Sequence, residues 1–244
     1  MTSRDEILKA INACLDIAKL PEHNGLQVEG RAEIKKIVFG VSAHMALFEA
    51  AHKAGADMII VHHGLFWPGI VQPLKGVFGR RCAFLLKHGI NLAGYHLPLD
   101  CHPALGNNAM LAQKIRLKNI EPFGDYHGAS IGFRGVLKPA RKLEDIHAKL
   151  GGVLVSAGKA KINTAAVISG GACDMLRQAE GAGIDLYITG TRDEFVVEYC
   201  KEAGISFIAM GHYNSEKSGI QALMAWTAKR FNVQTEFIDI PNPF

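Results

Sequence analysis

Short apolar runs that alternate with helix-like segments constrain the fold more than any other feature of this sequence. Residues 37–41 and 58–61 are continuous apolar stretches, as expected of strands buried on both faces of a parallel sheet. Between them, residues 43–54 have helical spacing and end at a glycine. A further helix is expected over 80–87 and a further strand over 90–95. This alternation predicts an α/β fold with mainly parallel sheets.

The second half of the sequence repeats this plan. The segment Gly-Ala-Asp-Met-Ile-Ile-Val at 55–61 aligns with Gly-Ile-Asp-Leu-Tyr-Ile-Thr at 183–189, an offset of 128 residues. This similarity could arise without duplication, because any two buried strand–helix units look alike. However, Gly-x-Asp and Gly-Ile recur in the same order in both halves, which favours an internal duplication. We therefore expect two related α/β/α domains, residues 1–122 and 123–244, whose terminal segments could interleave.

Charge and cysteine usage exclude several classes of protein. The 27 basic and 23 acidic residues give a formal charge of +4, and the basic residues form pairs rather than runs, so a nucleic-acid partner is not expected. No apolar run approaches the ~20 residues that span a bilayer, so no membrane partner is expected. The five cysteines have no CxxC spacing, and the N-terminus lacks the apolar core of a signal peptide, which predicts a reduced, cytoplasmic protein.

Histidines and acids follow three of the predicted strands. His62 and His63 end the strand at 58–61. His96 and Asp100 flank a His-Leu-Pro-Leu-Asp segment after the strand at 90–95, and Pro98 predicts that this segment is a loop. Functional residues of parallel α/β sheets gather outside the carboxyl ends of the strands, where these residues lie.

The third group is His212 and Glu216, after a strand expected at 206–210. Their i,i+4 spacing places both side chains on one helix face if a helix begins there, although the apolar spacing predicts a helix only over 219–226. A helix over 142–150 is expected between the halves.

Taken alone, each histidine group could also consist of surface or helix-capping residues that bind no metal. Adjacent strand residues point to opposite faces, so His62 and His63 share a site only where the strand turns into a loop, as Gly64 permits. Three groups at strand ends together favour a metal site, since imidazole and carboxylate are the ligands of Zn, Mn, Fe and Co hydrolases. The repeat counterparts of the His pair are Gly190 and Thr191, so one composite site between the domains is expected.

Other motifs are less specific. Ser-Gly-Gly at 169–171 fits a tight turn better than a phosphate-binding loop. Asn107 and Asn108 are interpreted as helix caps. The aromatic loop at 66–68 fits either core anchoring or stacking on a flat ring.

Taken together, these motifs resemble the GTP cyclohydrolase type 2 homolog family, also called the NGG-one-interacting-factor-three-like proteins. The matching segments are residues 24–28, 56–64, 96–100, 106–108, 189–190 and 211–212 with Glu216. The resemblance runs from about residue 20 to the C-terminus and is to the short bacterial form, with departures at Glu22-His23 and at Thr191.

The resemblance implies a dinuclear centre of two divalent metal ions, of Zn, Mn, Fe or Co. The implied ligands are His62, His63, Asp100, His212 and the bridging Glu216. His96 matches a position near the metals, as an occasional ligand or a neighbour of the ligands, and we expect it to act as a catalytic general acid or base. The family further implies two α/β domains and a toroidal homohexamer.

Three functions are compatible with these residues. The first is a metal-dependent hydrolase acting on a small molecule, such as a nucleotide, by GTP cyclohydrolase-type ring hydrolysis or phosphoester hydrolysis. The second is a non-catalytic metal-binding scaffold or metal-delivery protein. The third, a ring-shaped DNA-associated protein, is disfavoured by the mild charge.

Overall fold

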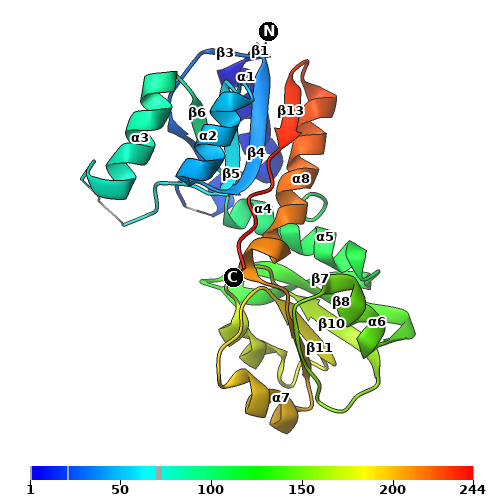
Figure 1. Ribbon diagram of the computed structural model, residues 1–244. Helices are drawn as coiled ribbons and strands as arrows, with labels where there is room; N and C mark the ends of the chain where they lie inside the picture. Colours follow the sequence, from blue (N-terminus) through cyan, green and yellow to red (C-terminus); the bar gives the residue numbers. More distant parts are fainter. Residues whose placement is uncertain (1, 21, 70–72, 244) are drawn as a thin grey trace. The chain divides into compact units, whose positions relative to one another are not determined.

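The computed structural model describes residues 2–20, 22–69 and 73–243 (Figure 1). The chain forms two compact units. The first comprises Met1–Leu99 and Ile220–Pro241, and the second comprises Asp100–Gly219 and Asn242–Phe244. The division expected from the sequence, at 122/123, lies inside strand β7 (Lys118–Tyr126), which pairs with β8 (Ala129–Lys142) on both sides of that point.

The first unit is built on a five-stranded sheet in the order β13-β4-β5-β6-β2. Its strands are β2 (Gly25–Val28), β4 (Lys36–Ser42), β5 (Met58–His63), β6 (Asn91–Gly94) and β13 (Gln234–Phe237). Strands β13, β4, β5 and β6 run parallel, and β2 joins β6 antiparallel. The strands expected from the apolar runs are therefore confirmed, with ends shifted by one or two residues.

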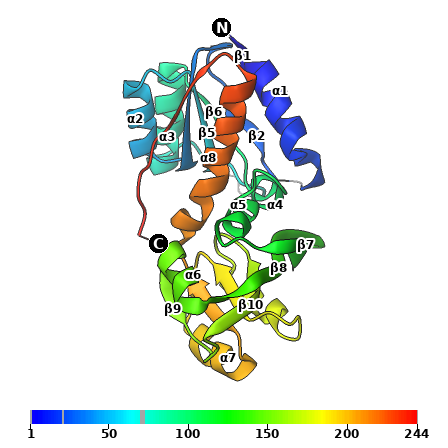
Figure 2. The same cartoon turned by 90° about the vertical axis from the view of Figure 1, so that its right-hand side faces the viewer.

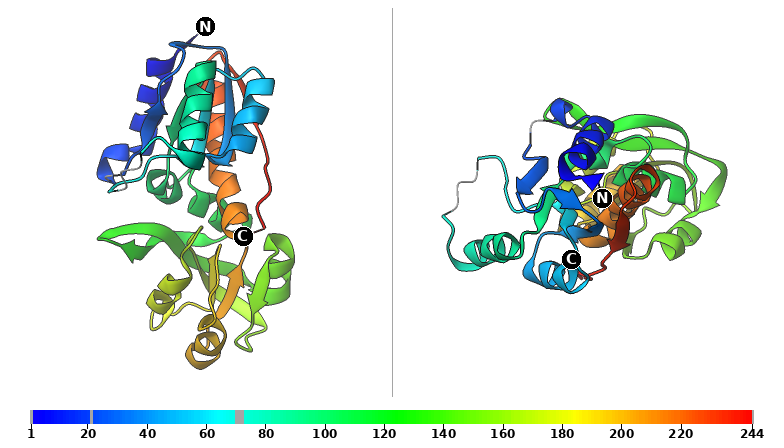
Figure 3. Two further views of the ribbon diagram at one scale, coloured as in Figure 1. Left: turned by 60° about the vertical axis from the view of Figure 1, so that its left-hand side comes forward. Right: turned by 90° about the horizontal axis from the view of Figure 1, so that it is seen from above.

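Helices cover both faces of this sheet. They are α1 (Arg4–Leu15), α2 (Met45–Lys53), α3 (Gly76–His88) and the later part of α8 (His212–Arg230). Figure 2 shows α2 and α3 on one side of the strands and α1 on the other, and the view from above in Figure 3 places α8 on the α1 side. Leu47 of α2 and Leu85 of α3 pack with Val38, Ile59 and Val61 of the strands into one apolar core.

The second unit has a six-stranded mixed sheet in the order β7-β8-β10-β11-β12-β9. Its remaining strands are β9 (Val153–Val155), β10 (Lys161–Val167), β11 (Leu186–Thr189) and β12 (Ser206–Ala209). Only β10, β11 and β12 are parallel. The expectation of mainly parallel sheets is correct for the first sheet and wrong for the second, because β7 and β8 form one hairpin whose strands must pair antiparallel.

The faces of the second sheet alternate along each strand. Leu186 and Ile188 point to the core that contains α5 (Asn107–Lys114) and α6 (Leu143–Leu150). Tyr187 lies between them in sequence and points to the other face, where its ring stacks with Phe207 at a centroid distance of 5.9 Å. The other helical segments of this unit are η2 (Cys173–Ala179) and α7 (Val196–Ala203).

The two Gly-x-Asp motifs make the same hydrogen bonds in their separate sheets. Asp57 Oδ2 accepts from the backbone N–H groups of residues 35 and 36, at 2.9 and 3.1 Å. Asp185 Oδ2 accepts from those of residues 163 and 164, again at 2.9 and 3.1 Å. Each aspartate thus precedes a central strand and holds the neighbouring strand, at the start of β4 and inside β10, and all these positions are related by the offset of 128.

Three local expectations are corrected. The segment at 96–100 is not a loop, because helix α4 (Leu97–Cys101) forms with Pro98 in its first turn, where the missing N–H has no helical partner to lose. Strand β5 continues through His62 and His63 instead of ending before them. Helix α8 begins at His212, well before the expected 219.

Among the described helices, none is both long and apolar enough to cross a membrane.

Candidate metal centre

The His pair stands at the carboxyl end of the central strand β5. His62 is fully buried, and its Nδ1 lies 2.8 Å from the carbonyl oxygen of Tyr95. Because a carbonyl oxygen only accepts, Nδ1 carries the proton and the ring lone pair is on Nε2. His63 is half-buried, and its Nδ1 lies 3.0 Å from the hydroxyl of Ser42, its register partner on β4.

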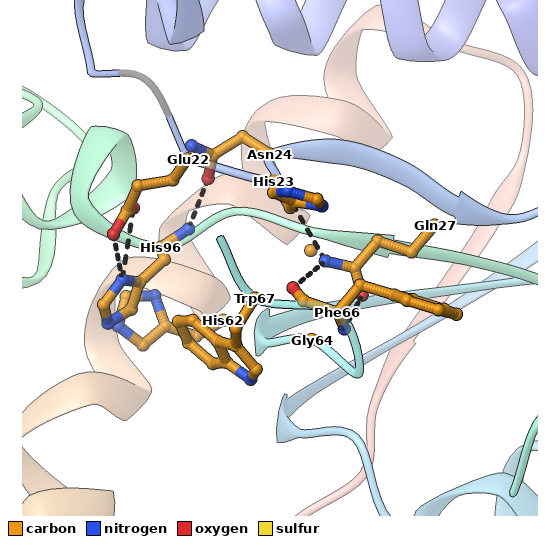
Figure 4. Close-up of a pocket in the computed structure, with 10 residues that line it drawn as sticks. Glu22, His23, Asn24, Gln27, His62, Gly64, Phe66, Trp67 and His96 are labelled. Atoms are coloured by element: carbon orange, nitrogen blue, oxygen red, sulfur yellow. Dashed lines mark hydrogen bonds and ion pairs between the residues drawn. The ribbon is translucent and has the colours of Figure 1, made fainter. Parts of the chain in front are cut away.

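His96 lies two residues after the end of β6, the strand next to β5. Hydrogen bonds hold both its backbone and its ring. Its backbone N–H donates to Asn24 Oδ1 at 2.8 Å. Its Nδ1 lies 3.1 and 3.2 Å from the two carboxylate oxygens of Glu22, as Figure 4 shows. As with His62, the acceptor fixes the proton on Nδ1 and leaves the lone pair on Nε2.

These three imidazoles form one group within the first unit. The ring centroids of His62 and His63 are 4.7 Å apart, and that of His96 lies 5.0 and 5.6 Å from them. One ring nitrogen from each lies within 4.8 Å of the others. Imidazoles on a single tetrahedral ion at 2.0–2.1 Å have nitrogens about 3.4 Å apart, so these nitrogens need to approach one another by at most about 1.4 Å.

The hydrogen bonds at Nδ1 are what a metal centre requires. Metal-bound histidines usually donate the other ring N–H to a carbonyl or carboxylate, which fixes both tautomer and orientation. His62 and His96 have this arrangement with Tyr95 O and Glu22, and His63 has a hydroxyl partner. The donor set therefore fits a borderline divalent ion such as Zn²⁺.

The Asn-Gly-Leu-Gln segment supports the loop that leaves the His pair. Gln27 Oε1 accepts from the backbone N–H groups of Leu65 and Phe66, at 2.7 and 3.3 Å. Its Nε2 donates to the carbonyl oxygens of His23 and Phe66, at 2.8 and 3.2 Å. Gly64 leaves room for this amide, since a Cβ there would lie 2.2 Å from Gln27 Oε1.

A hollow of about 10 Å³, enough for one water molecule, adjoins the imidazoles (Figure 4). Its walls include Glu22, Asn24, Gln27, His62, Trp67 and His96. Trp67 stands edge-on to His96, with ring centroids 4.9 Å apart. Phe66 packs instead against Phe78 at 5.3 Å and belongs to the core, so the two aromatic residues of this loop have different roles.

In the second unit, the buried Asp100 is held by neutral polar side chains. Its Oδ1 accepts from Asn107 Nδ2 and from the Ser169 hydroxyl, both at 2.9 Å. Asn108 Oδ1 accepts from the backbone N–H of Ser169 at 2.6 Å. The expectation that Asn107 and Asn108 cap a helix is wrong: Gly106 is the N-cap of α5, and both amides are buried around Asp100.

His212 and Glu216 occupy the first turns of α8 in the same unit. His212 Nε2 lies 3.3 Å from Glu216 Oε1, which is the i,i+4 contact that their spacing predicted. Glu216 is 2% exposed. Gly170 lies close to Glu216 and has a φ of +69°. A Cβ at this position would lie only 2.3 Å from Glu216 Oε1, so the site has no space for a side chain. The backbone N–H of Gly170 donates to Ser215 Oγ, in keeping with a tight turn.

The six predicted site residues thus form one group in each unit. The first unit gathers three imidazoles, and the second provides two carboxylates and one imidazole. Sequence reasoning missed Glu22, Gln27, Ser42 and Ser169, which hold these residues or their loops. A larger hollow of about 330 Å³ in the second unit, lined by residues such as Asn119, Arg134 and Thr164, contains none of the six.

The fold and the side chains define an α/β protein in which imidazole and carboxylate groups, at the carboxyl ends of parallel strands, could hold a divalent metal ion. The family model Duf34/NIF3 (NGG1p interacting factor 3) matches residues 2–243, and the chain belongs to this family.

Similar proteins span the whole chain. A relative from Pseudomonas aeruginosa, named GTP cyclohydrolase 1 type 2 homolog, is 43% identical over 237 residues, 94% of each chain. A relative of the same name from Archaeoglobus fulgidus is 41% identical over 238 residues, covering 97% of this chain and 95% of its own. The crystal structure of TTHA1606 from Thermus thermophilus superposes with a TM-score of 0.91 at 33% identity, covering 100% of both chains.

Proposed function

We propose that this protein is a dinuclear, divalent-metal-dependent hydrolase. The two ions would be held by His62, His63, Asp100, His212 and Glu216, and Glu216 would be the ligand that bridges them. The observation that carries the proposal is the hydrogen bonding of the imidazoles through Nδ1, which leaves Nε2 as the nitrogen to offer. A bound divalent ion supplies Lewis acidity, which polarises a substrate oxygen and activates water near neutral pH.

The site is composite and draws on both units. The imidazole group contains no carboxylate ligand, whereas the second group has two carboxylates but one imidazole. Neither group of three side chains alone provides the five ligands proposed for the two ions. The matching hydrogen bonds of Asp57 and Asp185 support the further proposal that the two units arose by duplication of one α/β element.

Within this site, His96 is the catalytic acid or base. The hydrogen bond from Nδ1 to Glu22 leaves one lone pair, at Nε2, which either takes a proton during the reaction or binds an ion when His96 serves as an occasional ligand. The proposed substrate is a nucleotide, hydrolysed at a purine ring carbon or a phosphoester. The names of the relatives, GTP cyclohydrolase 1 type 2 homolog, support this class. We further propose that the active form is a homohexamer in the cytoplasm.

Product analysis tests the activity. Protein reconstituted with Mn²⁺, Zn²⁺ or Fe²⁺ is incubated with GTP, with Glu216→Ala as the control. Formate or a ring-opened nucleotide, formed by the wild type alone, is the expected result for ring hydrolysis, and phosphate release alone would indicate a phosphoesterase. Absence of turnover at full metal occupancy would contradict the hydrolase and leave the non-catalytic metal-binding protein.

A further inference from the structure

Glu22 holds the ring of His96 in a way that the fold of the loop does not require. The backbone N–H of His96 is already held by Asn24 at 2.8 Å. Glu22 adds a two-oxygen contact to the ring at 3.1 and 3.2 Å and accepts the backbone N–H of Leu97 at 3.2 Å. The Glu22 carboxylate therefore accepts hydrogen bonds from both the imidazole of His96 and the backbone at the start of α4.

This contact is partly shielded from solvent. The side chains of Glu22 and His96 are 19% and 26% exposed, and both line the water-sized hollow beside His62. A hydrogen bond between an imidazole and a carboxylate in such a setting is stronger than one at the open surface, where water and salt screen the charge. It fixes the proton on Nδ1, opposes a ring flip, and leaves the lone pair on Nε2.

We infer that Glu22 is a positioning residue that directs His96 Nε2 into the imidazole group of His62 and His63. The inference rests on the proposed metal centre and adds a residue that neither the ligand set nor the catalytic assignment contains. Glu22 itself contacts neither metal nor substrate and acts through His96. With an ion bound, the arrangement would be a carboxylate–histidine–metal triad, in which the carboxylate fixes the tautomer and the orientation of the imidazole before the ion binds.

A double-mutant cycle on metal affinity tests the inference. Zn²⁺ and Co²⁺ dissociation constants are measured by competition with a chelator for wild type, Glu22→Ala, His96→Ala and the double variant. Glu22→Ala should weaken binding by about 10-fold or more in the wild-type background. It should have no further effect in the His96→Ala background, because the triad is already interrupted.

Two further variants separate positioning from loop structure. Glu22→Gln keeps an acceptor oxygen for Nδ1–H without the charge, so it should restore most of the affinity that Glu22→Ala loses. Glu33→Ala removes an exposed glutamate on β3 (Glu33–Ile34) and should leave the affinity unchanged. The visible d–d absorption of the Co²⁺ protein should shift in Glu22→Ala and return toward the wild-type spectrum in Glu22→Gln.

The outcomes distinguish this inference from the wider proposal. Equal losses from Glu22→Ala with and without His96, or an unchanged affinity and Co²⁺ spectrum, would overturn the role of Glu22. If Glu22→Ala fails to fold, the same cycle with Glu22→Gln decides, with a severalfold loss expected only when His96 is present. Failure of the wild type to bind either metal would instead remove the metal centre itself.

Discussion

At Gly170, the backbone makes room for a candidate metal ligand. Replacing it with alanine would place a Cβ 2.3 Å from Glu216 Oε1, at a φ of +69°. Gly183 has nearly the same φ, +70°, with no atom within 4 Å of the added Cβ. Both substitutions should therefore cost about 1 kcal/mol of stability from backbone strain, but only one displaces Glu216.

We expect Gly170→Ala to weaken Zn²⁺ or Mn²⁺ binding by about 10-fold or more, and Gly183→Ala to bind as the wild type does. Chelator competition measures both affinities, and urea unfolding verifies that both variants are folded under the conditions of the binding measurement. Matching affinities in the two variants would show that Glu216 does not serve as a ligand.

Gln27 contributes through four hydrogen bonds to the loop after the His pair. Gln27→Ala should lower the free energy of unfolding by roughly 2 kcal/mol, since several backbone groups lose their partner in a half-buried place. The exposed Gln113 at the end of α5 is the matched control, and its replacement by alanine should change stability by less than about 0.5 kcal/mol. Urea denaturation measures both, and an equal effect of the two would contradict the role of Gln27.

Among the elements, the central strands depend on the aspartates that precede them. Burial works against the charge of Asp185, but hydrogen bonds from Lys159 and from the backbone of residues 163 and 164 prevail and lower its pKa below the usual 3.8. A carboxylate with a lowered pKa stabilises the fold above its unfolded pKa, and that stabilisation disappears as the pH falls through the folded value.

Asp185→Asn should therefore be less stable than the wild type by about 2 kcal/mol at pH 7. The difference should shrink as the pH is lowered from about 5 toward 3, because the wild-type carboxylate becomes protonated while the amide does not change. Urea unfolding at a series of pH values measures this. A difference that stays constant over that range would contradict an ionised Asp185 in the folded state.

The elements that the sequence predicted best are those dominated by local apolar patterns. The runs at 37–41 and 58–61 became β4 and β5 because such strands are buried on both faces. The antiparallel half of the second sheet was missed because residues 118–142 are irregular in pattern and their pairing is set by a hairpin. Helix α4 was missed because Pro98 indicates a helix breaker unless the helix start is known.

For the candidate site, the sequence predicted the histidines and acids but not the side chains that hold them. The histidines and acids were found because they follow strand ends, and the His212–Glu216 contact follows from helical spacing alone. Their supporting partners lie far away in sequence: Glu22 is 74 residues from His96, and Ser169 is 69 residues from Asp100. No periodicity links such pairs, so only the folded chain identifies them.

For the whole molecule, self-association is the expectation that follows from the family. Several large apolar side chains of the first unit are exposed, among them Leu74, Val77 and Leu86 at 66%, 56% and 59%. Exposed apolar groups of this kind are common where protein surfaces associate. We expect a native mass about six times the 26.5 kDa of one chain by light scattering. A single species of one chain mass at micromolar concentration would contradict the hexamer.

Each chain is proposed to hold two divalent metal ions with Glu216 between them. Metal analysis of dialysed protein, after loading with Zn²⁺ or Mn²⁺, measures this stoichiometry for the wild type and for Glu216→Ala, with circular dichroism to verify folding. We predict two ions per wild-type chain and loss of most metal from a folded Glu216→Ala protein. A wild type that binds no metal, or a variant that keeps two ions, would contradict this prediction.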